Sequence, residues 1–284
     1  MGRLAAAACA AALLVGATAC GERSEPTGAT APLYPLTITT GDRPISVSNA
    51  ARRIAVLDSS SQEIVRALGA GGRIVMRAPT NAIDFGALRR SKPDLVIASG
   101  DVDERDLSRA ASTIRAIVYS APGDSIRQVE QAITQLGLLT GTPVQARGLV
   151  RTIERKRDAV DAALARTAIV NVFVDTGLLT TAPDQSLIGD VIREAHARNV
   201  AGDSVGGEPV DPKDLAERDP DVYVVTSDTG TSLADLRRNP QTRRLRAVRE
   251  GRFVVLDADL LQPGPQIGDG LDQVARLLHP DAFR

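Results

Sequence analysis

The side chains that most often catalyse reactions or bind metals are few and scattered in this sequence. The chain has two histidines, His196 and His279, in separate helical or terminal settings, so a zinc or manganese cluster is not expected. A Ser-His-Asp triad is formally possible, but there is no Gly-x-Ser-x-Gly nucleophile elbow and no P-loop. Asp257 and Asp259 flank a predicted strand end, and one carboxylate pair is weak evidence for acid–base catalysis. These residues favour a binding protein without metal or cofactor over an enzyme.

Polar side chains do recur at one kind of position, directly after a predicted buried strand. In open α/β sheets, ligands gather beyond the carboxyl ends of the strands. Arg77 adds a planar, permanently charged guanidinium that suits an anionic group. For each such residue the alternative is a helix cap or a solvated loop. The candidate ligand contacts are Asp58, Ser59, Ser60, Arg77, Ser99, Asp101, Tyr119 and Ser120 in the first half of the chain, and Asp175, Thr176, Gln185, Thr226, Ser227, Asp257 and Asp259 in the second.

The elements that must position these residues alternate between strand and helix patterns, which indicates βαβ units and largely parallel sheets. A hairpin is predicted over residues 36–47. Strands are predicted at 54–57, 74–76, 95–98, 117–119, 169–174, 222–225 and 253–256, with helices at 62–68, 103–111, 125–139, 187–195, 211–218, 241–248 and 267–278.

One longer helical pattern separates the two halves of this alternation. It runs from Pro143 to about Arg166 and would be about 36 Å long at 1.5 Å per residue. We therefore predict an α/β fold in which two α/β lobes with mostly parallel sheets are joined by a single long helix, with a ligand cleft between the lobes. The expected boundaries are an N-terminal lobe over 35–142, the inter-lobe helix over 143–166 and a C-terminal lobe over 167–284.

The first residues have the pattern of an export signal. Arg3 precedes a small and apolar run over residues 4–16, which is too short for a transmembrane helix and leads into small residues before a cut site. Residues 1–20 are therefore predicted to be a lipoprotein signal peptide. The following stretch, 21–34, is rich in Gly, Ser, Thr and Pro and is predicted to be a flexible tether.

Both cysteines of the chain fall within this signal. Cys20 follows the small residues as in a bacterial lipobox, so we expect it to be lipidated and to hold the protein at the cell membrane outside the cytoplasm. Ala17 stands where the lipobox usually has Leu, and the alternative is an ordinary secretory signal with an incidental cysteine. Cys9 would be removed with the leader, which leaves the mature domain without a free thiol or disulfide.

Charge is balanced along the chain, with 34 basic residues against 35 acidic ones and a net charge of −1. Because no basic block is present, nucleic-acid binding has little support. We expect a monomer that binds a small molecule.

Taken in order, several segments resemble the cobalamin and ferric-siderophore class of ABC-transporter solute-binding proteins. They are RRIAVLDSSSQEIVRALGAGGRIV (52–75), KPDLVIASG (92–100), the long helix, DPDVYVVTS (219–227), QTRRLRAVREGRFVVLDADLL (241–261) and GLDQVARLLHP (270–280). The resemblance extends from about residue 35 to the C-terminus. It implies a ligand held between two lobes, a periplasmic or lipid-anchored location, and docking onto a permease with a cytoplasmic ATPase.

The family docks through one acidic residue on each lobe. Glu104, at the start of the helix after LVIAS, matches the first position. The second position falls on Lys213, and the neighbouring Asp214 is the candidate substitute. The alternative for both acids is a helix N-terminal charge that interacts with the helix dipole.

The low aromatic content bears on the ligand. Corrinoid and haem rings are usually held by stacked aromatics, and the chain offers Tyr119 and at most Phe85 or Tyr223. A siderophore-like chelate held by Arg and polar groups is therefore preferred to cobalamin. The alternative function is a lipoprotein on the same scaffold that acts as a non-transport interaction or sensory module, which Lys213 favours; an exported hydrolase is a distant third.

Overall fold

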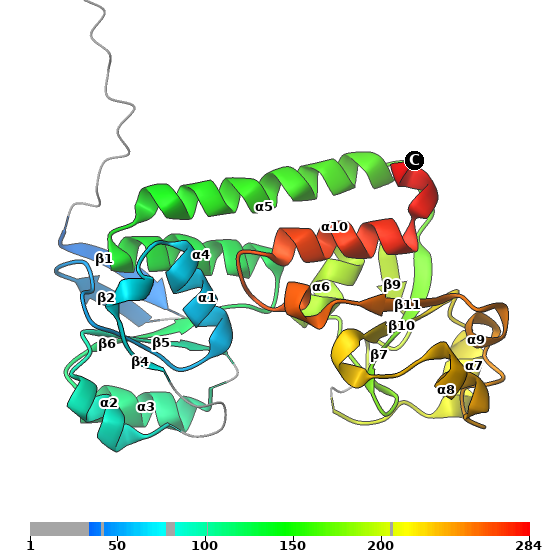
Figure 1. Cartoon of the computed structure of the whole chain (residues 1–284), viewed down its shortest axis with the longest axis horizontal. Helices are drawn as coiled ribbons and strands as arrows, with labels where there is room; N and C mark the ends of the chain where they lie inside the picture. Colours follow the sequence, from blue (N-terminus) through cyan, green and yellow to red (C-terminus); the bar gives the residue numbers. More distant parts are fainter. Residues whose placement is uncertain (1–33, 41–42, 78–82, 101, 205–206) are drawn as a thin grey trace, which may run out of the picture. The chain divides into compact units, whose positions relative to one another are not determined.

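Two separate, largely parallel sheets form the framework of the protein (Figure 1). The computed structural model describes residues 34–40, 43–77, 83–100, 102–204 and 207–284, which all belong to one compact unit. The predicted signal peptide, Cys20, most of the tether and Asp101 lie outside the described residues. The side chain of Glu104 is likewise outside the description.

The first sheet has the strand order β4-β3-β5-β6, with every neighbouring pair parallel. All five residues of β5 are buried, as expected for a parallel strand that is covered on both faces. Figure 1 shows α1 and α4 on one face and α2 and α3 on the other. We call this sheet and its helices the N-terminal lobe: β3 (Ile54–Val56), α1 (Ser59–Ala67), η1 (Gly71–Arg73), β4 (Ile74–Arg77), α2 (Phe85–Ser91), β5 (Leu95–Ser99), α3 (Glu104–Thr113), β6 (Ile117–Ala121) and α4 (Ile126–Thr140). The predicted hairpin is β1 (Leu36–Thr40) and β2 (Arg43–Val47), which pair antiparallel.

The second sheet has the order β11-β10-β7-β8, with β9 on β7. All pairs are parallel except β7 with β8, which form a tight antiparallel turn. Phe173 and Tyr223 pack edge-to-face at 5.4 Å in a core cluster of this sheet. We call this sheet and its helices the C-terminal lobe: β7 (Val170–Gly177), β8 (Thr180–Thr181), α6 (Leu187–Glu194), β9 (Ala197–Asn199), α7 (Pro212–Arg218), β10 (Val222–Thr226), η2 (Ser227–Thr229), α8 (Leu233–Arg238), α9 (Arg246–Glu250), β11 (Phe253–Leu256), η3 (Ala258–Leu261), α10 (Ile267–Leu278) and η4 (Pro280–Phe283).

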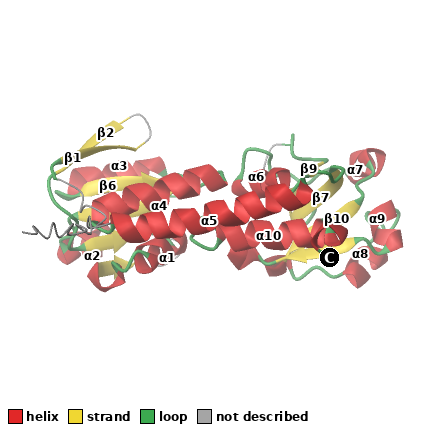
Figure 2. Cartoon of the chain, turned by 90° about the horizontal axis from the view of Figure 1, so that it is seen from above, coloured by secondary structure: helices red, strands yellow, loops and turns green. Residues whose placement is uncertain are grey.

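The long helix α5 (Pro143–Leu164) contacts helices of both lobes. It begins after Gly141, which ends α4 in the left-handed conformation, and Pro143 occupies its first turn. It packs against α4 of the N-terminal lobe and α10 of the C-terminal lobe, and Figure 2 shows it running across both lobes. The predicted fold class is thus confirmed. The helix ends two residues before the predicted Arg166.

The pattern over 241–248 is the main error in the predicted elements. The structure has turns there, and α9 begins only at Arg246. Thr242 is buried and its hydroxyl donates to the Leu236 carbonyl at 2.7 Å, which stabilises the turn in place of a helix start. None of the helices within the described ranges combines the length and apolar character that a membrane crossing requires.

Candidate functional site: a cavity between the lobes

A cavity of about 370 Å³ lies between the carboxyl ends of the two sheets, where both lobes contribute to its wall. The N-terminal lobe supplies the residues that follow β5 and β6. The C-terminal lobe supplies the ends of β7 and β8, the start of α6 and the loop before α10. The lining residues are Ser99, Gly100, Gly123, Asp124, Thr176, Thr181, Ala182, Pro183, Ser186, Leu187, Ile188, Gly207, Leu261, Gln262 and Pro263.

Hydrogen bonds between strand ends hold the N-terminal wall. The backbone N–H of Ser99 donates to Asp58 Oδ2 at 2.8 Å, and Asp58 Oδ1 accepts the N–H of Ser61 at 2.7 Å. Asp58 therefore caps α1 and ties it to the end of β5. Next to this, the Asp124 N–H donates to Gln128 Oε1 at 2.7 Å, which fixes the loop that enters α4.

The C-terminal wall depends on the start of α6. Ser186 caps this helix by accepting the N–H of Gly189, and its hydroxyl donates to the Pro183 carbonyl at 2.6 Å. A Cβ at Gly189 would lie 2.3 Å from that carbonyl oxygen, so the tight turn requires glycine here. Thr181 donates to the Val174 carbonyl at 2.8 Å and so joins β8 to β7.

Ser99 and Thr176 are the predicted ligand contacts that line this cavity. Ser99 is buried at the end of β5, whereas Thr176 is exposed at the end of β7. The residues that sequence reasoning missed are mainly those on the loops before α4, α6 and α10. A signal for one of them was present, because Ser186 directly precedes an amphipathic helical pattern, as an N-cap does.

Tyr119 was predicted as a ligand contact, and the structure corrects this. Its side chain is fully buried under α4, and its hydroxyl donates to Gln135 Oε1 at 2.6 Å. Burial raises the pKa of Tyr119 well above its usual range, so the hydroxyl stays protonated. A tyrosine in mid-strand, facing the helices, packs in the core rather than the cleft.

Asp175 is a second correction. It is buried, and its Oδ1 accepts the N–H groups of Gly177 and Leu179 at 2.8 and 3.1 Å. Its Oδ2 accepts the hydroxyl proton of Tyr223 at 2.6 Å. This carboxylate therefore builds the β7–β8 turn, where Leu178 and Leu179 both have positive φ.

The remaining candidates do not line the cavity, and several of them bind neighbouring backbone. The N–H of Asp259 donates to Asp257 Oδ1 at 3.0 Å, and the N–H of Ala258 donates to Ser227 Oγ at 3.0 Å. Ser60 and Thr226 are buried and Ser120 is half-buried. The exposed candidates away from the cavity lining are Ser59, Arg77, Gln185, Ser227, Asp257 and Asp259.

The predicted docking positions lie at helix starts. Glu104 is the first residue of α3. Lys213 and Asp214 are exposed in the first turn of α7, which Asp211 caps by accepting the Lys213 N–H at 2.8 Å. Their role in docking stays a prediction.

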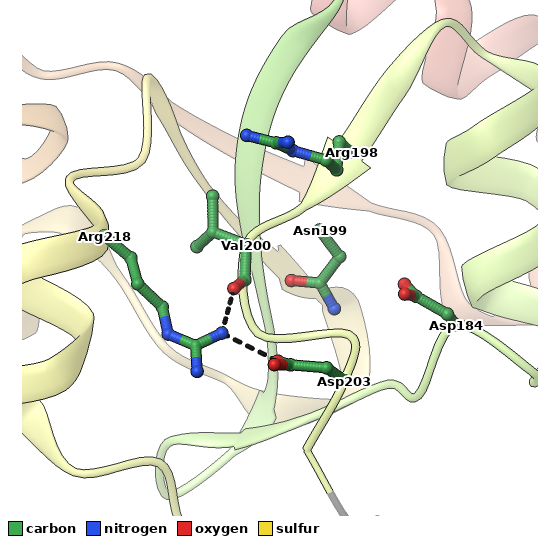
Figure 3. A pocket seen from close by; sticks show the side chains of 6 residues that line it. All are labelled: Asp184, Arg198, Asn199, Val200, Asp203 and Arg218. Carbon is green, nitrogen blue, oxygen red and sulfur yellow. Dashed lines mark hydrogen bonds and ion pairs between the residues drawn. The ribbon is translucent and has the colours of Figure 1, made fainter.

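A second hollow, of about 390 Å³, lies within the C-terminal lobe (Figure 3). Arg218 donates there to the Val200 carbonyl and to Asp203 Oδ1, the latter at 2.7 Å, and this hydrogen bond lowers the pKa of Asp203. The buried Asn199 amide donates to Thr181 Oγ1 and the Ala182 carbonyl. Since these groups bind one another, the hollow is a weaker candidate than the interlobe cavity. Over the described residues, no three His, Cys, Asp or Glu side chains are placed to hold a metal ion.

Comparison with known proteins points in one direction. The family described as "Periplasmic binding protein" matches residues 78–260, more than half of the chain. A comparison with curated protein sequences found no match.

Solved structures share the fold at low sequence identity. CeuE of Helicobacter pylori with Ni(II) bound is 16% identical, with a TM-score of 0.76 over 87% of this chain and 90% of that one. The periplasmic vitamin B12 binding protein BtuF of Vibrio cholerae is 19% identical, with a TM-score of 0.72 over 82% and 98%. The periplasmic heme-binding protein RhuT of Roseiflexus, in apo form, is 22% identical, with a TM-score of 0.69 over 82% and 100%.

Proposed function

This chain belongs to the periplasmic binding protein family, and from that premise we propose that it delivers a ferric siderophore-like chelate, in preference to cobalamin, to an ABC permease with a cytoplasmic ATPase. It is an extracytoplasmic binding protein of the ABC-importer type and not an enzyme. The observation that carries the proposal is the interlobe cavity, because both lobes line it and a bound solute would contact both.

The size and lining of the cavity favour a compact polar chelate. Its 370 Å³ lies towards the lower end of the range of about 300–1,000 Å³ that is usual for small-molecule sites. No aromatic side chain occurs among the described lining residues, so a corrinoid or haem ring would lack a stacking partner. Ser99 and Thr176 instead offer hydroxyl groups.

The charge of the lining residues further restricts which chelates the cavity can bind. Asp124 is the one ionisable side chain among the described lining residues, and Arg77, the predicted partner of an anion, is exposed elsewhere at the end of β4. A carboxylate at the wall repels a polyanionic ligand. We therefore favour a neutral ferric chelate over a polyanionic one such as ferric citrate.

A thermal-shift and titration series on the purified protein tests this proposal. A ligand that binds only the native state raises stability as its concentration increases. We expect a neutral ferric hydroxamate to raise Tm, and ferric citrate, cobalamin and haem to leave it unchanged. Thr176→Val should weaken the binding, whereas the matched change Thr37→Val, at an exposed threonine of β1 outside the cavity lining, should not. A shift with cobalamin alone would overturn the preference for a chelate.

The lipid anchor is part of the same proposal. Cys20 following small residues supports it, since lipidation would hold the binding domain beside its permease. Wild-type protein should fractionate with membranes, and Cys20→Ala protein should not; equal release of both would contradict the anchor.

A second function has one observation in its favour, the exposed Lys213 at a position where the family docks through an acid. A lipoprotein that no longer docks would act as an interaction or sensory module. It would bind none of the solutes above and would instead retain a protein partner in pull-down experiments from its own membrane.

A further inference from the structure

A polar seam joins the two lobes beside the cavity. On α4, Ile126 and Glu130 lie one turn apart, and on α6, Asp190 and Glu194 have the same spacing. Residues four apart share one helix face. The N–H of Ile126 donates to Asp190 Oδ2 at 2.9 Å, so a carboxylate of the C-terminal lobe binds the first turn of a helix in the N-terminal lobe.

Arg157 of α5 completes this seam. Its Nε donates to Glu194 Oε2 at 2.9 Å, and its Nη1 donates to Glu130 Oε1 at 3.0 Å. One guanidinium on the spanning helix therefore pairs with a carboxylate from each lobe. The side chains of Arg157, Glu130 and Glu194 are only 19%, 13% and 17% exposed, so solvent screens these pairs little.

The charges of the seam depend on one another. Burial raises the pKa of Glu130, and the hydrogen bond and charge of Arg157 oppose that rise. Burial also opposes the charge on Arg157, but the carboxylates of Glu194 and Glu130 outweigh it and raise its pKa. Removal of the guanidinium would leave two partly buried carboxylates without their shared partner, which is costly.

The seam lies next to both walls of the cavity. α4 begins two residues after the lining residue Asp124, and α6 begins with the lining residues Leu187 and Ile188. A shift of α4 against α6 would therefore move one wall relative to the other.

We propose that Arg157 is a positioning residue for solute capture: by binding Glu130 and Glu194 together, it sets the spacing between the two walls of the interlobe cavity. The effect on capture rests on the proposed function, whereas the effect on spacing does not.

Distance measurements between the lobes test the spacing directly. Cys9 and Cys20 are first replaced by Ser, so that the only thiols are those introduced for labelling. Spin labels are then attached at two exposed positions, Arg89→Cys in α2 and Arg249→Cys in α9, and the distribution of distances between them is measured. We expect Arg157→Met to broaden or shift this distribution. Arg155→Met is the matched control, because Arg155 is exposed on the same helix and its one hydrogen bond among the described residues goes to Thr152, one turn away.

A mutant cycle keeps the test valid if Arg157→Met does not fold. Glu130→Gln and Glu194→Gln each weaken one arm of the bridge. If Arg157 links the lobes, either change alone should broaden the distances nearly as much as both together. Purely local roles predict instead additive losses of Tm with an unchanged distance distribution in the folded protein. That outcome, or an unchanged distribution in Arg157→Met, overturns the proposal.

The same variants then address capture. With the chelate that shifts wild-type Tm, we expect the Kd of Arg157→Met to be about tenfold higher than that of the wild type, an effect of the size typical of residues that act from outside a site. The Kd of Arg155→Met should be unchanged. If no solute binds the wild type, the proposed function fails while the distance result still stands. If distances change and Kd does not, the seam does not position the cavity walls for capture.

Discussion

At the residue scale, the carboxylates and hydroxyls at strand ends mostly serve the fold. The reason is that a buried strand end leaves backbone N–H groups that need acceptors. Asp58 and Asp175 supply those acceptors, so little of either side chain is available to a ligand. A small hydroxyl such as Ser99 or Thr176 can sit at the cavity wall because other groups bind the surrounding backbone.

The two buried tyrosines give a matched pair of predictions. Tyr223 donates to a carboxylate and Tyr119 to a neutral amide oxygen. Hydrogen bonds to charged groups contribute about 1.5–3 kcal/mol, and neutral ones about 0.5–1.5 kcal/mol. We expect Tyr223→Phe to lower the free energy of unfolding by about 2 kcal/mol and Tyr119→Phe by about 1 kcal/mol. Urea unfolding measures both, and equal losses would contradict the role given to Asp175.

At the element scale, the close approach of α4 and α5 depends on a glycine. A Cβ on Gly137 of α4 would lie 2.4 Å from the Cβ of Ala146 on α5. The two helices are joined by the short turn at Gly141 and Thr142, so they have little freedom to separate at this point. The packing that orients the spanning helix therefore begins here.

This contact predicts opposite outcomes for two glycines in helices. Gly137→Ala should lower the free energy of unfolding by about 1–3 kcal/mol because it overpacks the α4–α5 contact. Gly148→Ala on α5 meets nothing within 4 Å and should raise stability by up to about 1 kcal/mol, because alanine favours helices. Thermal unfolding of the two variants provides the comparison. A stabilised Gly137→Ala protein would show that the helices do not pack this closely.

At the scale of the whole molecule, several contacts besides α5 link the lobes around the cavity. Gln266 Nε2 donates to Glu63 Oε2 at 3.1 Å, and Gly123 faces Pro263 so closely that a Cβ would lie 2.9 Å from the proline Cβ. Together with the Ile126–Asp190 hydrogen bond, these contacts mean that the distance between the cavity walls depends on how the two lobes pack against each other.

A wedge at the Gly123 contact tests this arrangement. Gly123→Ala should push the lobes apart, lower Tm and weaken solute binding. We expect the free energy of unfolding to fall by about 1 kcal/mol or more. Pro263→Gly in the same protein should restore binding by removing the facing ring. Gly100→Ala is the control, since Gly100 lines the cavity but a Cβ there meets nothing within 4 Å. Equal effects at Gly100 and Gly123 would argue against a lobe contact.

The sequence by itself determined the fold class, because strand and helix periodicities are local signals that one sequence is enough to show. The periodicity over 143–166 likewise predicted the spanning helix to within two residues of its end. The pattern over 241–248 failed because the Thr242 hydroxyl binds the Leu236 carbonyl six residues earlier, which stabilises a turn where the pattern predicted a helix start.

Only the tertiary structure decided which polar residues face the cavity. Ser99 and Tyr119 were both predicted as ligand contacts because they end predicted strands, yet Ser99 lines the cavity and Tyr119 lies under α4. The side of the sheet on which a side chain lies depends on register and on which helix covers that face, and neither is a local property of the sequence. The bridge from Arg157 to Glu130 and Glu194 was equally hidden, because its partners are 27 and 37 residues away along the chain and meet only when the two lobes pack on α5.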